Sequence, residues 1–139
     1  MDQERRRAAV AALVELTASN AYLDRADAGR ALASFAELPE SREPLLRLVL
    51  DAEDTFVTRV TAEALLRRHD RAGIAIVAEA LAAADFQHGT YIHEAVEAVF
   101  LVFASERDQA MAICEALGAA ELRGMLAEID PLLHPQDPS

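Results

Sequence analysis

Apolar residues recur at α-helical spacing along almost the whole chain, and the alternating pattern of β-strands is nearly absent. Breaks between the helical stretches fall at Asn20, Pro39, Asp54, Asp70 and Gly89, whose residue types favour turns and helix caps. The pattern therefore predicts an all-α fold. We expect helices near 3–19, 24–38, 42–52, 55–69, 71–84, 90–105, 107–118 and 120–130.

Local signals locate the starts of three of these helices. Asp54 precedes an apolar periodic stretch and is expected to be an N-cap, because its carboxylate can accept a backbone N–H of the first turn. Ser41 followed by Pro44 indicates a second helix start, since proline is tolerated in a first turn. Gly89 is expected to end a loop, so that the following helix begins at about residue 90.

Length and composition favour one compact unit. The chain has 139 residues, of which 53% are hydrophobic, and a folded chain of this size buries roughly two-thirds of its surface. We expect a single domain over 1–130 and a tail over 131–139 that contains three prolines. No signal peptide and no uninterrupted apolar run of about 18 residues is visible, so we expect a cytoplasmic protein without membrane contact.

The net charge of −11 is unevenly distributed. Residues 1–71 hold 11 Arg and 13 Asp or Glu, whereas residues 72–139 hold two Arg and 11 Asp or Glu, which gives −2 and −9. Nucleic acid is not expected as a partner, because a phosphate backbone needs cations. A basic protein is the complementary partner. The alternative is that the acidic charge only keeps the domain soluble.

Internal repetition is the most informative feature of the chain. Residues 78–85 (AEALAAAD) and 114–121 (CEALGAAE) align without a gap at a spacing of 36, and 49–54 fits the same frame 31 residues earlier. The preceding stretches 57–65 and 92–100 correspond in the same way. One helical hairpin does not bury its apolar faces alone, so such units must stack on their neighbours. The repetition predicts stacked helical hairpins.

The segment Asp54–Asp85 resembles a HEAT-like repeat of the short bacterial type. Thr58 stands where that family usually has arginine, and His69 where it usually has a turn glycine. A looser likeness extends over about 24–121. The matching positions are Asp54, Val57, Ala62, Ala64, Leu65, Asp70, Leu81 and Asp85.

The resemblance implies a right-handed α-α superhelix, a HEAT-like solenoid of about three helical hairpins with terminal capping helices. It also implies a function, because HEAT-like modules chiefly bind other macromolecules. A few relatives act on bilins or on alkylated DNA. The absence of tryptophan and the lack of a histidine partner for the single cysteine count against those two activities.

Two features could carry chemistry, and both have simpler explanations. His93 and Glu97 lie four residues apart and share a helix face, but the zincin pattern needs a second histidine where Glu97 stands. Cys114 lies among apolar residues in an acidic region, which disfavours a reactive thiolate. We therefore predict no catalytic residue, no metal site and no cofactor.

The acidic residues of the second half are the predicted partner-binding surface. Glu79 and Glu115 occupy the same position of the repeat, as do Asp85 and Glu121, so stacking would bring each pair close together. Two acids so arranged also suit a glycosidase, but that chemistry needs a cleft and one raised pKa. The predicted acidic ridge consists of Glu79, Asp85, Glu94, Glu97, Glu115 and Glu121.

Three functional hypotheses follow. The first is a non-enzymatic protein–protein interaction module whose acidic C-terminal surface binds a basic partner, for example an immunity or antitoxin protein that masks a cationic nuclease. The second is a ligand-binding or enzymatic HEAT-like protein that uses a groove between repeats. The third is a self-assembling structural domain. Its apolar C-terminal residues would form a dimer seam in a homodimer, or cap the stack in a monomer. Those residues are Met125, Leu126, Ile129, Leu132 and Leu133.

Overall fold

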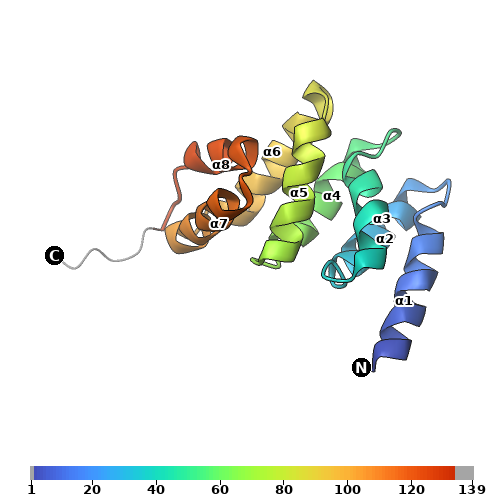
Figure 1. Ribbon diagram of the computed structural model, residues 1–139. Helices are drawn as coiled ribbons and strands as arrows, with labels where there is room; N and C mark the ends of the chain where they lie inside the picture. The colour runs from blue at the N-terminus through green and yellow to red at the C-terminus, as the bar shows by residue number, and fades with distance from the viewer. Residues whose placement is uncertain (1, 134–139) are drawn as a thin grey trace.

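A computed structural model of the chain describes residues 2–133, which form eight α-helices joined by short turns (Figure 1). The predicted all-α fold is confirmed, and each predicted helix has a counterpart within a few residues. In this part of the chain no helix has the length and hydropathy to cross a membrane. The helices are α1 (Gln3–Leu16), α2 (Tyr22–Ala33), α3 (Pro39–Val49), α4 (Thr55–Leu66), α5 (Arg71–Ala83), α6 (Phe86–Phe100), α7 (Ala104–Leu117) and α8 (Ala120–Ala127).

The helices pack in two rows. In one row α4 lies between α2 and α6, and in the other α5 lies between α3 and α7. The rows contact each other through successive helices, while α1 packs on α2 and α3, and α8 packs on α5, α6 and α7. Figure 1 shows the chain running from α1 at one end of an elongated molecule to α7 and α8 at the other. Sequence neighbours are therefore also spatial neighbours, as hairpin stacking requires.

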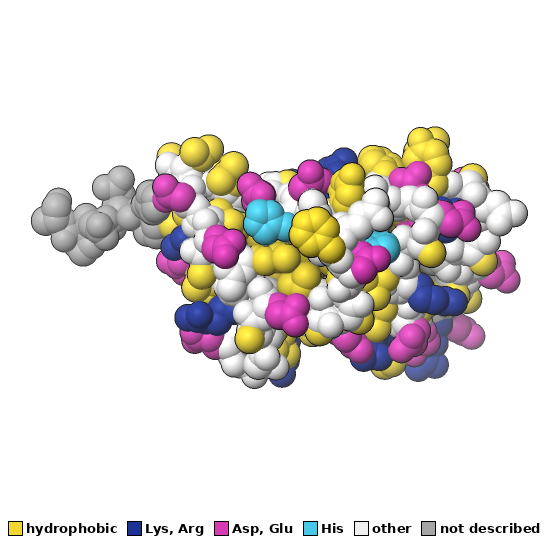
Figure 2. Space-filling model, turned by 90° about the horizontal axis from the view of Figure 1, so that it is seen from above, with side chains coloured by type: hydrophobic (Ala, Val, Ile, Leu, Met, Phe, Trp, Pro, Cys, Tyr) yellow, Lys and Arg dark blue, Asp and Glu magenta, His cyan; other side chains and the backbone are white. Residues whose placement is uncertain are grey.

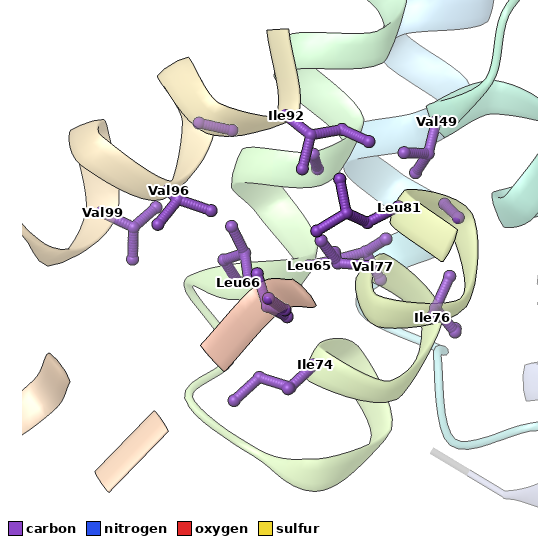
Figure 3. Close-up of a cluster of buried hydrophobic side chains, with 14 of the residues drawn as sticks. Val49, Leu65, Leu66, Ile74, Ile76, Val77, Leu81, Ile92, Val96 and Val99 are labelled. Atoms are coloured by element: carbon purple, nitrogen blue, oxygen red, sulfur yellow. The ribbon is translucent and has the colours of Figure 1, made fainter. Parts of the chain in front are cut away.

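The core runs between the two rows. Figure 3 shows side chains of α4, α5 and α6 converging there, among them Leu65, Val77 and Ile92. All three of these side chains are fully buried. Their burial follows from the helical period, which places apolar residues of each helix on the face that meets the other row. One cluster of buried residues extends from Val10 of α1 to Ile129 beyond α8, so the apolar contacts are continuous along the stack.

Aspartates begin three successive helices. The side chain of Asp54 accepts the N–H of Phe56, that of Asp70 accepts the N–H of Gly73, and that of Asp85 accepts a third backbone N–H. The predicted N-cap at Asp54 is confirmed. Each cap satisfies one of the backbone donors that a helix leaves unpaired at its start.

Two of the predicted helix starts are wrong. Helix α3 begins at Pro39, so Ser41 is a buried residue of its first turn and Pro44 lies inside the helix. Helix α6 begins at Phe86, one turn earlier than predicted, and Gly89 belongs to its helical backbone. In both cases a strong breaker residue inside the first turns led the sequence analysis to place the start too late. Pro39 is tolerated as the first helical residue because its N–H would have no helical acceptor. Pro44 is the sixth residue of α3 and has no N–H to donate to the carbonyl of Glu40.

The described part of the predicted tail returns to the helices. The N–H of Leu132 donates to the carbonyl of Leu101 at 2.7 Å, and that of Leu133 donates to Val102 at 2.6 Å. Leu126 and Ile129 are buried, whereas Leu132 and Leu133 are 70% and 54% exposed. The first two thus close the core at this end of the stack, and the last two present apolar surface. Residues 134–139 of the predicted tail lie outside the described residues.

The glycines of α5 and α6 provide a test of the helix packing. A Cβ on Gly73 would overlap the backbone carbonyl oxygen of Leu65, whereas a Cβ on Gly89 would meet no atom within 4 Å. We expect Gly73→Ala to lower the free energy of unfolding by about 1–3 kcal/mol, because a helix backbone has to move. We expect Gly89→Ala to raise it by about 0.4–1 kcal/mol, because alanine restricts the unfolded chain and favours the helix.

Urea unfolding of the two variants beside the parent chain measures both effects. A destabilising Gly89→Ala would mean that α6 does not include residue 89. A neutral Gly73→Ala would mean that α4 and α5 are not in backbone contact.

Candidate functional site: an acidic groove between α5, α6 and α8

A groove of about 410 Å³ lies where α5 ends, α6 begins and α8 packs against both. Its apolar wall includes Leu81, Ala84 and Met125, and its carboxylates come from Asp85 and Glu121. Figure 2 shows acidic side chains spread over the face seen from above, with hydrophobic and histidine side chains near its middle. The lining residues are Leu81, Ala84, Asp85, Phe86, Gly89, Thr90, His93, Glu121 and Met125.

Phe86 is the most exposed large hydrophobic residue among those described. It is the first residue of α6, and 92% of its surface is accessible. Only Ala84 and Asp85 separate α5 from α6, so the chain turns sharply and the ring has no preceding helical turn to pack on. The ring lies beside the apolar residues that line the groove, and apolar surface rimmed by polar groups marks an interaction site where it forms a continuous patch.

The first turn of α6 is fixed by His88. Its Nε2 lies 2.7 Å from the carbonyl oxygen of Asp51, and its Nδ1 lies 2.8 Å from Oδ1 of Asp85. Both neighbours accept hydrogen bonds, so both ring nitrogens carry a proton when both bonds are made. The hydrogen bond to the Asp51 carbonyl is the main cause that raises the pKa of His88; burial opposes it and Asp85 adds to it. In turn, the His88 backbone N–H and ring lower the pKa of Asp85.

Asp51, whose carbonyl contacts His88, is itself held by a buried ion pair. The guanidinium of Arg25 in α2 donates from Nε and Nη2 to the two carboxylate oxygens of Asp51, at 3.0 and 3.1 Å. The side chains are only 8% and 10% exposed. Asp51 also accepts the backbone N–H of Asp54 at 2.9 Å. The loop before α4 is therefore held on one side by α2 and on the other by His88 of α6.

The structure brings two of the six predicted ridge residues, Asp85 and Glu121, into the groove. Glu97 lies next to it, since its Oε1 is 2.9 Å from Nδ1 of His93, a groove residue. Glu94 is exposed on the same helix. These four thus belong to the groove or to the helix that forms one of its walls.

The other two ridge residues form ion pairs with arginines. Glu79 of α5 pairs with Arg42 of α3, and Glu115 of α7 pairs with Arg123 of α8 at 2.8 Å. Neither glutamate lines the groove. A basic partner has less to gain at these two positions, because each carboxylate already has a guanidinium beside it.

The residues considered for chemistry are arranged for structure or surface contacts. His93 pairs with Glu97, and within residues 2–133 no group of three or more His, Cys, Asp or Glu side chains could hold a metal ion. Cys114 is fully buried, and burial raises the pKa of its thiol despite the opposing charge of Arg123. The groove thus offers carboxylates, one imidazole and an apolar wall, which are groups suited to binding.

Sequence reasoning missed Phe86 because it placed a loop there. The signal that could have placed Phe86 in a helix is Asp85. An aspartate followed by a continuous helical pattern favours a helix start, even when the fourth residue of the helix is a glycine. It also missed the bond between His88 and the Asp51 carbonyl, which joins residues 37 positions apart. No local pattern predicts such a contact.

Neither protein-family models nor curated proteins nor solved structures match this chain. The likeness to HEAT-like repeats stays a prediction from the residues.

The His88 contact makes stability depend on pH. A raised pKa in the folded state stabilises the protein fully below the unfolded value of 6.5, and this contribution is lost as pH rises through the folded pKa. We expect His88→Gln to lower the free energy of unfolding by about 1–2 kcal/mol near pH 6, because a charge-assisted bond becomes neutral. The difference from the parent chain should shrink as pH rises through the raised value.

The matched control is His93→Gln. The contact between His93 and Glu97 is more exposed, so its loss should lower the free energy of unfolding by less than about 0.5 kcal/mol at either pH. Urea unfolding at two pH values measures both variants. A His88→Gln effect that is equal at both values would contradict a charged His88.

Proposed function

We propose that this chain is a non-enzymatic protein-binding module, and that the acidic groove binds a basic, partly apolar segment of a partner protein. The observation that carries the proposal is Phe86, an almost fully exposed ring beside a groove with two carboxylates. Aromatic anchors surrounded by polar rims are typical of the energetic centres of protein interfaces. The surrounding charge suits a cationic partner, because residues 72–139 carry −9.

We further propose that the two rows form a right-handed HEAT-like superhelix. The adjacency of α2, α4 and α6, and of α3, α5 and α7, supports this proposal because corresponding helices of such repeats occupy the same row. Modules of this architecture bind through extended surfaces rather than enclosed pockets. An immunity-type protein that masks a cationic toxin is one class that combines small size with such charge.

A direct test uses a short synthetic peptide that alternates arginine and leucine, labelled for fluorescence anisotropy. We expect it to bind the full chain, and the binding to weaken at roughly 0.5 M salt, which screens exposed charges. Phe86→Ala should reduce the affinity by roughly tenfold or more, the equivalent of exposing a buried phenyl ring again. Glu121→Gln should reduce it about twofold to fivefold, as expected for a charge at a rim.

The control is Glu79→Gln, which removes an exposed carboxylate that lies outside the groove and is paired with Arg42. It should leave the affinity unchanged. If it weakens binding as much as Glu121→Gln does, the acidic surface as a whole is responsible. If Phe86→Ala has no effect, or if a peptide that alternates glutamate and leucine binds equally well, the proposed groove is not the binding site.

A further inference from the structure

The outer faces of α2 and α4 form a second groove with the opposite charge. It has a volume of about 320 Å³ and is lined by three arginines, one carboxylate and two apolar side chains. The arginines are Arg30 of α2, Arg59 of α4 and Arg67, the C-cap of α4, and the carboxylate is Glu63. The formal charge of the lining is therefore +2. This is notable in a chain whose net charge is −11.

Glu63 forms ion pairs with both Arg59 and Arg67. Its Oε2 lies 3.4 Å from Arg59 and its Oε1 lies 2.7 Å from Arg67, one helical turn to either side. A single carboxylate thus orients two guanidinium groups toward one groove while neutralising one charge. The spacing of four residues, which puts side chains on the same helix face, makes this arrangement possible.

An aromatic ring orients the arginine of α2 as well as Arg59. The guanidinium carbons of Arg30 and Arg59 each lie 5.7 Å from the centroid of the Phe56 ring, which in turn contacts the ring of Tyr22 edge-on. Cation–π contact holds a guanidinium in place without using its N–H donors. Among residues 2–133, Arg30 donates to Asp27 at 3.3 Å and Arg59 donates to Glu63 at 3.4 Å, and no other acceptor of these two guanidinium groups is found. Since each guanidinium has five donors, most remain available.

We propose that this arginine groove binds a phosphate monoester group. Such a group carries about −1.5 to −2 at neutral pH. The lining carries +2, and Asp27 beside Arg30 lowers the local charge to +1, so the groove stays cationic and attracts an anion. Guanidinium groups bind phosphate oxygens through paired N–H donors, and three of them here are already oriented by Phe56 and Glu63. Val60 and Ala64 provide an apolar surface for the carbon chain that carries the phosphate. This site is separate from the acidic groove and independent of its function.

The test is isothermal titration of the full chain in low-salt buffer with three probes: inorganic phosphate, glycerol phosphate and a short phosphoserine peptide. We expect saturable binding at one site. Arg30→Gln and Arg67→Gln should each weaken the binding by roughly tenfold, because each removes charge-assisted hydrogen bonds. Arg67→Lys, which keeps the charge but loses the paired donors, should fall between the parent chain and Arg67→Gln.

One variant is expected to raise the affinity for phosphate instead of lowering it. Glu63→Gln removes the competing negative charge but keeps a side-chain oxygen that can accept a hydrogen bond from an arginine, so phosphate should bind more tightly by about threefold to tenfold. The control is Arg47→Gln, which removes an exposed arginine of α3 and should leave the affinity unchanged.

A phosphoserine peptide that binds more tightly than glycerol phosphate would assign the site to phosphorylated proteins, and the reverse order would assign it to small phosphate esters. The proposal is overturned if none of the three probes binds saturably. It is also overturned if Arg47→Gln weakens the binding as much as the groove variants do, since general charge attraction would then suffice. Circular dichroism of each variant establishes that α2 and α4 are intact.

Discussion

Helix α4 is enclosed by α2, α3, α5 and α6, and the burial of its apolar side chains is the constraint on which the other features depend. Seven of its twelve residues are buried, including Val57, Leu65 and Leu66. Each valine or leucine among them contributes roughly 1.5–3 kcal/mol when its side chain leaves water. Only a narrow strip of the helix reaches solvent, and that strip carries Phe56, Arg59 and Glu63. The arginine groove is thus a consequence of how completely the rest of α4 is covered.

Polar contacts between loops complement this core and connect stability to the candidate site. The pair of Arg25 and Asp51 is buried, and breaking such a pair typically costs about 3–5 kcal/mol because one charge is left without compensation. The carbonyl oxygen of the same Asp51 accepts a hydrogen bond from His88, and this bond fixes the first turn of α6. Phe86 lies in that turn. The orientation of the proposed binding surface therefore depends on a contact that reaches back to α2.

The sequence was a good guide to elements and a weaker one to sites. All eight helices were predicted because their apolar period is strong, and Asp54 was predicted as a cap because capping is local. Two helix starts were misplaced where Pro39 and Gly89 suggested a turn, although both residues lie in the first turn of a helix. The acidic ridge was predicted from charge and from equivalent positions in the repeat, but neither signal predicts ion pairs between different helices, such as that of Glu79 with Arg42. The arginine groove was missed for the same reason, since Arg30 comes from another helix than Arg59.

Hydrogen exchange of backbone amides, followed by mass spectrometry on the native chain, tests most directly whether α4 is the element on which the structure depends. Amides of enclosed helices exchange only when the whole unit unfolds, whereas those at the ends of a stack open locally. We expect the slowest exchange in α4 and in the segments of α5 and α6 that cover it, with faster exchange in α1 and α8. Exchange in α4 as fast as in α1, or protection concentrated at one end of the molecule, would contradict it.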